Sequence, residues 1–150
     1  MTDAIRSLVV GAAALGLTFA WLAIHTVRTD ATAPDRLVLE LRLAQFAALL
    51  LVLIAGVYVG FAIVADLASN AGWDVALAIG FLVLASMATT WDPRQALTAL
   101  TLAFAAHAGI DLLHTIDMLP SEMAPRWYFT ACAIYDVVIA GLCYLPILRR

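Results

Sequence analysis

Side chains with the chemistry of acids, bases and ligands occur inside two strongly apolar segments in the C-terminal third of the chain. His107, Asp111 and His114 lie in one segment, and Asp136 lies in the next. Imidazole and carboxylate groups exchange protons, form charge-assisted hydrogen bonds and bind metal ions. An ionised group near the centre of a bilayer costs roughly 2.5–3.5 kcal/mol even on the lenient insertion scale, and such groups often mark a functional site.

The spacing of the first three residues predicts that they share one face of a helix. His107, Asp111 and His114 follow one another at positions i, i+4 and i+7. At 100° per residue their directions fall within roughly 60° of one another.

The next apolar segment presents a matching face that carries Phe129, Cys132 and Asp136. His107 and Asp136 each lie eleven residues from the expected outer end of their segment, which is about 16 Å in a helix. If the two segments are antiparallel neighbours, Asp136 lies level with His107, and Asp111 lies nearer the outer surface. The equal depth predicts one shared site.

Three interpretations of this site remain open, and a structural role is the leading one. A hydrogen bond between His107 and Asp136 would hold two helices together, as polar pairs in membranes commonly do. The second interpretation is a metal or haem site. The third is a proton-handling or substrate-binding pocket that opens outward, because chains of aspartate and histidine form proton relays.

Helix geometry limits the metal interpretation. His107 and His114 are about 10.5 Å apart along a helix axis, too far for one ion to bind both. One ion could use His107, Asp111 and Asp136, or Asp111 with His114 and an outer-loop carboxylate. A bis-histidine haem needs two ligands at the same depth in the membrane. His25 lies near the cytoplasmic end of the first apolar segment, whereas His107 is central in its own segment. Zinc, iron, manganese and copper all suit such ligands, so no metal and no cofactor is assigned.

The composition is that of an integral membrane protein. Of 150 residues, 65% are hydrophobic and 13% are charged, against about half and a quarter in soluble domains. The net charge of −3 and the absence of lysine leave no basic surface for a nucleic acid. Cys132 and Cys143 are about 16 Å apart in a helix, which excludes a disulfide between them.

Five segments are apolar enough to span a bilayer, which needs about 20 residues in a helix. Because backbone polar groups need internal partners in lipid, we expect helices. The connections are short, so consecutive helices should be antiparallel neighbours in one all-α domain covering residues 1–150. The expected spans are residues 5–27, 37–67, 73–90, 94–116 and 126–148.

The distribution of arginine predicts the orientation of these spans. Six arginines fall on one side of the expected membrane and two on the other, and positive residues favour the cytoplasm. We therefore expect a multi-pass protein of a bacterial inner (plasma) membrane or its equivalent, with the N-terminus outside and the C-terminus in the cytoplasm. The cytoplasmic arginines would be Arg28, Arg36, Arg42, Arg94, Arg149 and Arg150; the outer ones would be Arg6 and Arg126.

The other polar residues are expected to have ordinary surface roles. Arg36 and Glu40 are four residues apart and should form a solvated, salt-linked helix start. His25 should lie at the interface beside Trp21. Four acids are expected to be solvated on the outer face: Asp66, Asp74, Asp117 and Glu122.

These features favour a non-enzymatic accessory or small-molecule-binding subunit whose ligand is a lipid or a quinone-like molecule. The alternative is a membrane-embedded enzyme on a lipophilic substrate, in which His107 is the acid/base and Asp136 orients it, or both hold a metal. Expected partners are membrane lipid, a lipophilic small molecule, and a further protein chain or a second copy. The residues expected to bind the ligand are Asp111, His114, Cys132 and Phe129.

Overall fold

The computed structural model describes residues 3–64, 72–119 and 124–149, and it is all-α. The five helices are α1 (Asp3–Arg28), α2 (Pro34–Val64), α3 (Gly72–Ala88), α4 (Pro93–Thr115) and α5 (Arg126–Leu148). The prediction of five helices in one bundle is confirmed, and their ends agree with the expected spans to within a few residues. The expected end of the second span, residues 65–67, lies outside the described residues.

Four of the helices are long and apolar enough to cross a membrane: α1, α2, α4 and α5. The third is shorter, with 17 residues, or about 25 Å at 1.5 Å per residue. A membrane span requires roughly 20 residues, so α3 is shorter than a typical membrane-spanning helix. The number of helices in the described residues was therefore predicted correctly, and length and composition suit four of them to cross a membrane.

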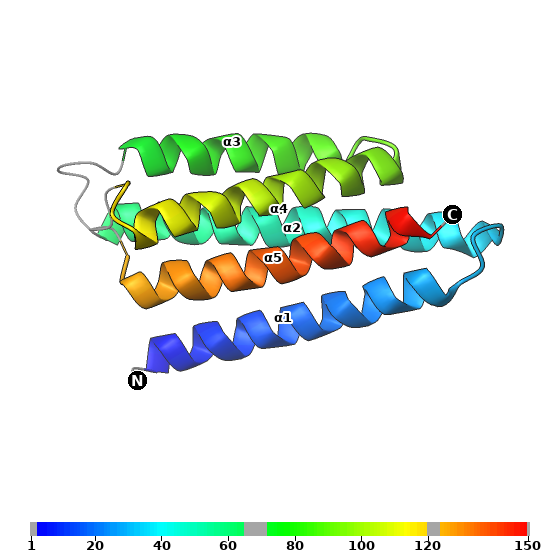
Figure 1. Cartoon of the computed structure of the whole chain (residues 1–150), viewed down its shortest axis with the longest axis horizontal. Coiled ribbons are helices and arrows are strands. Elements are labelled where there is room, and N and C mark those ends of the chain that lie inside the picture. Colours follow the sequence, from blue (N-terminus) through cyan, green and yellow to red (C-terminus); the bar gives the residue numbers. More distant parts are fainter. Residues whose placement is uncertain (1–2, 65–71, 120–123, 150) are drawn as a thin grey trace.

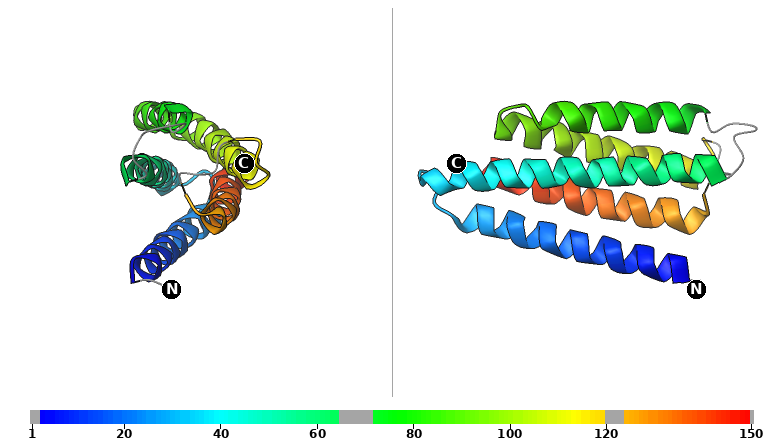
Figure 2. Two further views of the ribbon diagram at one scale, coloured as in Figure 1. Left: turned by 90° about the vertical axis from the view of Figure 1, so that its left-hand side faces the viewer. Right: turned by 180° about the vertical axis from the view of Figure 1, so that it is seen from behind.

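The helices lie side by side with alternating directions (Figure 1). Neighbouring pairs connect α3, α4, α5 and α1 into one curved layer, and α2 contacts all four. Viewed along the helices, α2 lies on the concave side of that layer (Figure 2). Consecutive helices are thus in contact, as the short connections predicted.

The core contains large side chains from α2, α4 and α5 together with many alanines. Leu51, Leu100, Phe104 and Ile139 are fully buried. Alanines fill the positions between them, and such small residues let helices approach closely.

The first helix packs less closely than the others. Its buried residues Phe19, Ala23 and Thr26 all belong to its C-terminal half. Toward its N-terminus, α1 diverges from α2 (Figure 2). The two helices are therefore joined at one end of the bundle, here called the Arg36 end, and separated toward the other.

Candidate functional site

His107 and Asp136 form a direct contact in the interior of the bundle, between α4 and α5. The Nδ1 atom of His107 lies 2.7 Å from the Oδ2 atom of Asp136, and both side chains are almost completely buried. The equal depth expected from the sequence is confirmed. The two helices are antiparallel neighbours, so residues the same distance from the connecting loop meet.

Asp111 and Tyr58 extend the contact between His107 and Asp136 into a larger polar group. The Oδ2 atom of Asp111 lies 3.5 Å from His107 Nδ1, and its Oδ1 atom accepts a hydrogen bond from the Tyr58 hydroxyl. Tyr58, on α2, is a residue that the sequence reasoning missed. The available signal was a lone hydroxyl in the middle of an apolar span, between the glycines Gly56 and Gly60.

Cys132 is the fifth polar residue at this place. Its Sγ atom lies 3.8 Å from Asp136 Oδ2, one turn earlier on the same face of α5. We call Tyr58, His107, Asp111, Cys132 and Asp136 the central cluster. One donor atom each from the last four lie within 4.8 Å of one another.

The surroundings of the central cluster are apolar and aromatic. The rings of Tyr58 and Phe81 meet the His107 imidazole edge-on, with centroids 5.1 and 4.9 Å away. In such a site electrostatic attraction is stronger than in water, and an unpaired charge is costly. One imidazole here faces two carboxyl groups, so the cluster can hold a proton or bind a cation.

His114 belongs to a second buried pair. Its Nε2 atom lies 3.1 Å from Asp74 Oδ1, and its ring stacks on Phe129 with centroids 4.6 Å apart. The prediction that Asp74 is solvated is wrong. Asp74 lies in the first turn of α3, on the side that packs against α4, and only 4% of its surface is exposed.

Asp117 and His25 are exposed, in agreement with their predicted surface roles. Asp117 is exposed and forms an ion pair with Arg126 at 2.6 Å. His25 is exposed and stacks on Trp21. Two further acids lie outside the described residues: Asp66 and Glu122.

A small, partly enclosed space lies beside one member of each buried pair. It has a volume of about 10 Å³, and its walls include Tyr58, Asp74 and His107. That volume is roughly the size of one water molecule.

A larger groove runs between α1, α2 and α5, where α1 diverges from α2. Its volume is about 530 Å³ and its walls are almost entirely apolar. Gly11 of α1 lies on one wall, and a Cβ atom built there meets no atom within 4 Å. Tyr128, Cys132 and Tyr135 of α5 line the opposite part. Cys132 is therefore the member of the central cluster that also lines the groove.

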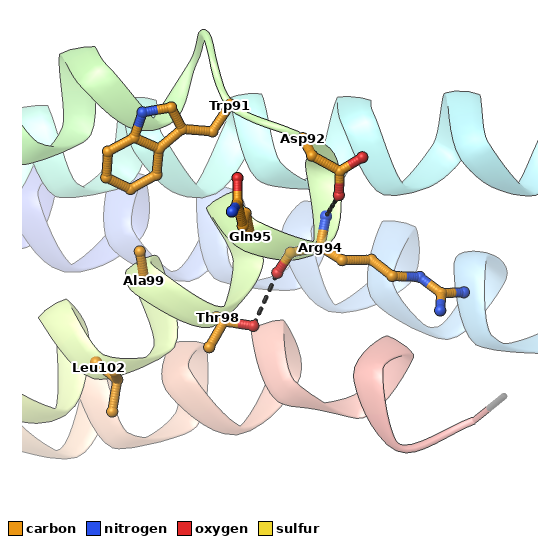
Figure 3. Close-up of a pocket in the computed structure, with 7 residues that line it drawn as sticks. All are labelled: Trp91, Asp92, Arg94, Gln95, Thr98, Ala99 and Leu102. Carbon is orange, nitrogen blue, oxygen red and sulfur yellow. Dashed lines mark hydrogen bonds between the residues drawn. The ribbon is translucent and has the colours of Figure 1, made fainter.

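An open hollow lies near the Arg36 end, over the first turns of α4 (Figure 3). Asp92 precedes the helix and accepts a hydrogen bond from the Arg94 backbone amide at 3.0 Å, which identifies it as the N-cap. Thr98 bonds back to the carbonyl of Arg94. All the residues of this hollow belong to one short segment, so it is a surface feature of a single helix.

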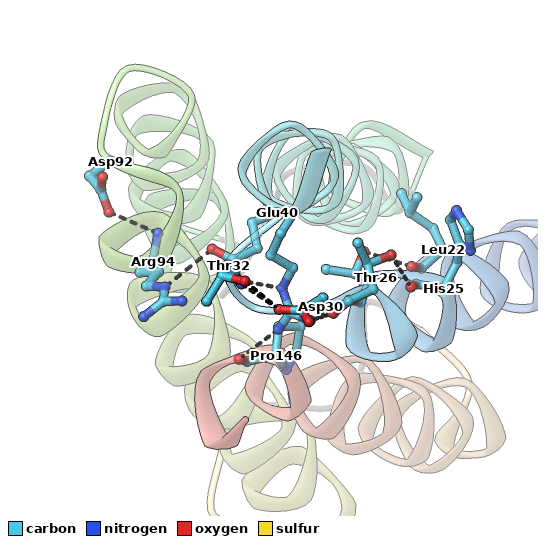
Figure 4. Close-up of polar contacts among 11 residues, drawn as sticks. Leu22, His25, Thr26, Asp30, Thr32, Glu40, Asp92, Arg94 and Pro146 are labelled. Carbon is cyan, nitrogen blue, oxygen red and sulfur yellow. Dashed lines mark hydrogen bonds and ion pairs between the residues drawn. The ribbon is translucent and has the colours of Figure 1, made fainter. Parts of the chain in front are cut away.

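Arg36 forms a buried network at the same end. Its guanidinium bonds to Glu40 Oε1 at 2.8 Å and to the carbonyl oxygens of Thr26 and Pro146. Arg94 reaches the other carboxylate oxygen of Glu40 at 3.2 Å, as Figure 4 shows. The salt link was predicted correctly, but the expectation that it is solvated is wrong, because Arg36 and Glu40 are each 2% exposed.

The reason for this burial lies in the ends of α1 and α5. The last carbonyls of a helix have no partner within that helix, and a cation there is also favoured by the helix dipole. Arg36 satisfies carbonyls of both helices at once. The connection from α1 is further ordered by Thr32, which bonds to Asp30 and holds the pKa of that carboxyl below its usual range.

We compared the chain with protein-family models, with curated proteins and with solved structures, and none of them matches it.

Proposed function

We propose that this chain is an integral membrane protein that binds a lipophilic small molecule of the quinone class in the groove between α1, α2 and α5. One observation carries the proposal: the groove reaches Cys132, and the thiol of Cys132 contacts Asp136. A ligand lying there would have its apolar part against α1 and α2 and its polar part beside the central cluster.

The size and position of the groove support this function. Pockets for small molecules are typically about 300–1,000 Å³ and mostly apolar, and this one is about 530 Å³. Because α1 packs weakly in its N-terminal half, a molecule dissolved in the bilayer can enter sideways without first crossing into water.

The polar side chains of the groove indicate the chemistry of the ligand. They are hydrogen-bond donors without charge: Ser7, Trp127, Tyr128, Cys132 and Tyr135. Neutral donors suit the carbonyl oxygens of a quinone. A phospholipid phosphate would need arginine or lysine, and neither lines this groove.

The burial of the central cluster favours binding over catalysis. His107 is 3% exposed and Asp136 is fully buried, so a substrate in the groove would meet Cys132 before either of them. In the alternative function, an enzyme with His107 as the acid/base, helices would have to separate before the substrate reached the imidazole.

We also propose the inner membrane as the location, with the N-terminus outside. Arg28, Arg36, Arg42, Arg94 and Arg149 lie at the Arg36 end, where α1 and α5 finish and α2 and α4 begin. The positive-inside rule assigns that end to the cytoplasm. A reporter phosphatase that folds only outside the cytoplasm should be inactive when fused to the C-terminus. An active fusion would reverse the orientation.

The binding proposal is tested with decylbenzoquinone and the full chain in lipid nanodiscs. Gly11→Leu places a side chain in the groove, and its Cβ atom would meet no other atom within 4 Å. Gly80→Leu is the matched control, because Gly80 is an exposed helical glycine of α3 with equally open space around it. We expect saturable binding of one quinone per chain, at least tenfold weaker in Gly11→Leu and unchanged in Gly80→Leu. Equal affinity in both variants would contradict the proposal.

A further inference from the structure

The central cluster places two carboxyl groups around one imidazole, so its own residues cannot balance the charge when both carboxyl groups are ionised. Among the described residues, His107 is the base that pairs with Asp136 and with Asp111. A proton on the imidazole offsets one carboxylate and leaves the other. Buried charges in apolar surroundings need a partner, since removing them from water costs several kcal/mol per ion. The cluster therefore has a place for a further positive charge.

Two carboxylate oxygens of the cluster also lack hydrogen-bond partners within the described part of the chain. They are Asp111 Oδ2, whose contact with His107 Nδ1 is 3.5 Å long, and Asp136 Oδ1, and both are buried. The other oxygen of each carboxylate is occupied, by the Tyr58 hydroxyl and by His107 respectively. An unpaired buried acceptor is unfavourable by about 1–3 kcal/mol, and a cation would use these lone pairs.

The spacing of the donor atoms matches that of a metal site. Ligands at 2.0–2.3 Å from a tetrahedral ion are roughly 3.3–3.7 Å from one another. His107 Nδ1 lies 2.7 Å from Asp136 Oδ2 and 3.5 Å from Asp111 Oδ2, and Cys132 Sγ lies 3.8 Å from Asp136 Oδ2. Small side-chain shifts are sufficient for all four to reach one ion.

Helices α4 and α5 each supply two of these donors, at the same spacing. His107 and Asp111 are one turn apart on α4, and Cys132 and Asp136 are one turn apart on α5. Residues at i and i+4 share a helical face, so each helix contributes two ligands to the interface that the two helices share.

The geometry points to a divalent transition-metal site of the zinc type, with His107, Asp111, Cys132 and Asp136 as its ligands. A thiolate beside an imidazole favours zinc over magnesium and calcium, which prefer oxygen ligands. Binding would displace any protons on the imidazole Nδ1 and the thiol, and the ion's two positive charges would offset two of the three negative charges carried by the thiolate and the two carboxylates. Tyr58, bonded to Asp111, would orient that ligand from outside the coordination shell.

The site is tested with cobalt(II), which replaces zinc and reports thiolate coordination by its absorption. The full chain is purified in detergent, treated with a chelator and titrated with cobalt chloride. We expect one cobalt per chain and a thiolate-to-cobalt charge-transfer band. Cys132→Ser should abolish the band, and Asp136→Asn should weaken binding at least tenfold. Cys143→Ser is the control, since Cys143 is the other buried cysteine of α5, and it should leave the spectrum unchanged.

Each result decides for or against the metal site. Serine is nearly isosteric with cysteine, so we expect Cys132→Ser to fold like the unaltered protein. Circular dichroism of both proteins checks that their helical content is the same. No stoichiometric cobalt binding, or a band that persists in Cys132→Ser, would overturn the inference. A metal-free protein that binds no cobalt and becomes more stable in Asp136→Asn would show that a proton balances the cluster instead. The titration uses no quinone, so its failure is separate from that of the proposed function.

Discussion

Among the variants considered, replacing the buried Arg36 is expected to lower the free energy of unfolding the most. Replacing Arg36 with Met keeps an unbranched side chain but removes the buried one of the two arginines that bond to Glu40, which is itself 2% exposed. It also leaves the carbonyls of Thr26 and Pro146 without that donor. Breaking a buried pair by removing one partner costs about 3–5 kcal/mol. Arg94 is half-exposed and can compensate only in part, so we expect a loss in that range.

The assay is reversible unfolding in mixed detergent micelles, followed by circular dichroism. Arg42→Met is the matched control, because Arg42 is an exposed arginine of the same helix and should change stability by less than about 0.5 kcal/mol. The double variant Arg36→Met/Glu40→Leu should lose less than Arg36→Met alone, since it buries no uncompensated carboxylate. Equal stability of Arg36→Met and Arg42→Met would refute the reasoning.

Two further variants test the buried pairs near the centre of the bundle by the same assay. Tyr58→Phe removes the hydroxyl that bonds to Asp111 and should destabilise the fold by about 1–3 kcal/mol; unchanged stability would mean that the hydroxyl is not buried against the carboxylate. Asp74→Ala should cost at least as much, because it removes the buried partner of His114. Asp117→Asn removes the charge of an exposed ion pair and keeps a side chain suited to the φ of 59° at this residue, so it should cost at most about 1 kcal/mol. A similar loss in both aspartate variants would contradict the burial of Asp74.

The sequence was most informative where helical periodicity and depth could be counted. Apolar runs that approach or exceed the length of a bilayer span predicted the helices, and the i, i+4 rule placed His107 and Asp111 on one face. The short connection between the last two segments then made them antiparallel neighbours, which predicted the contact between His107 and Asp136. These inferences depend only on local geometry and on one adjacent pair of helices.

Contacts between helices that are distant in sequence were not predictable in the same way. Tyr58 reaches Asp111 from α2, and Asp74 reaches His114 from α3. Both contacts depend on how the helices rotate about their axes, which an apolar pattern without strong amphipathicity does not determine. We expected the Arg36 side chain to be solvated, because arginine side chains usually are. In the structure, the helix ends around Arg36 supply carbonyl oxygens that need a hydrogen-bond donor.

The most direct test of the central claim is a double-mutant cycle between the two residues at the centre of the cluster. His107→Phe, Asp136→Leu and the double variant are unfolded in the presence of a chelator, so that no metal contributes. Direct contact predicts a coupling free energy of about 1.5–3 kcal/mol, in the range for hydrogen bonds to charged groups. His107→Phe with Asp117→Leu, at the bundle surface, should be additive. Additivity of the His107 and Asp136 changes within about 0.5 kcal/mol would show that the imidazole and the carboxylate do not meet.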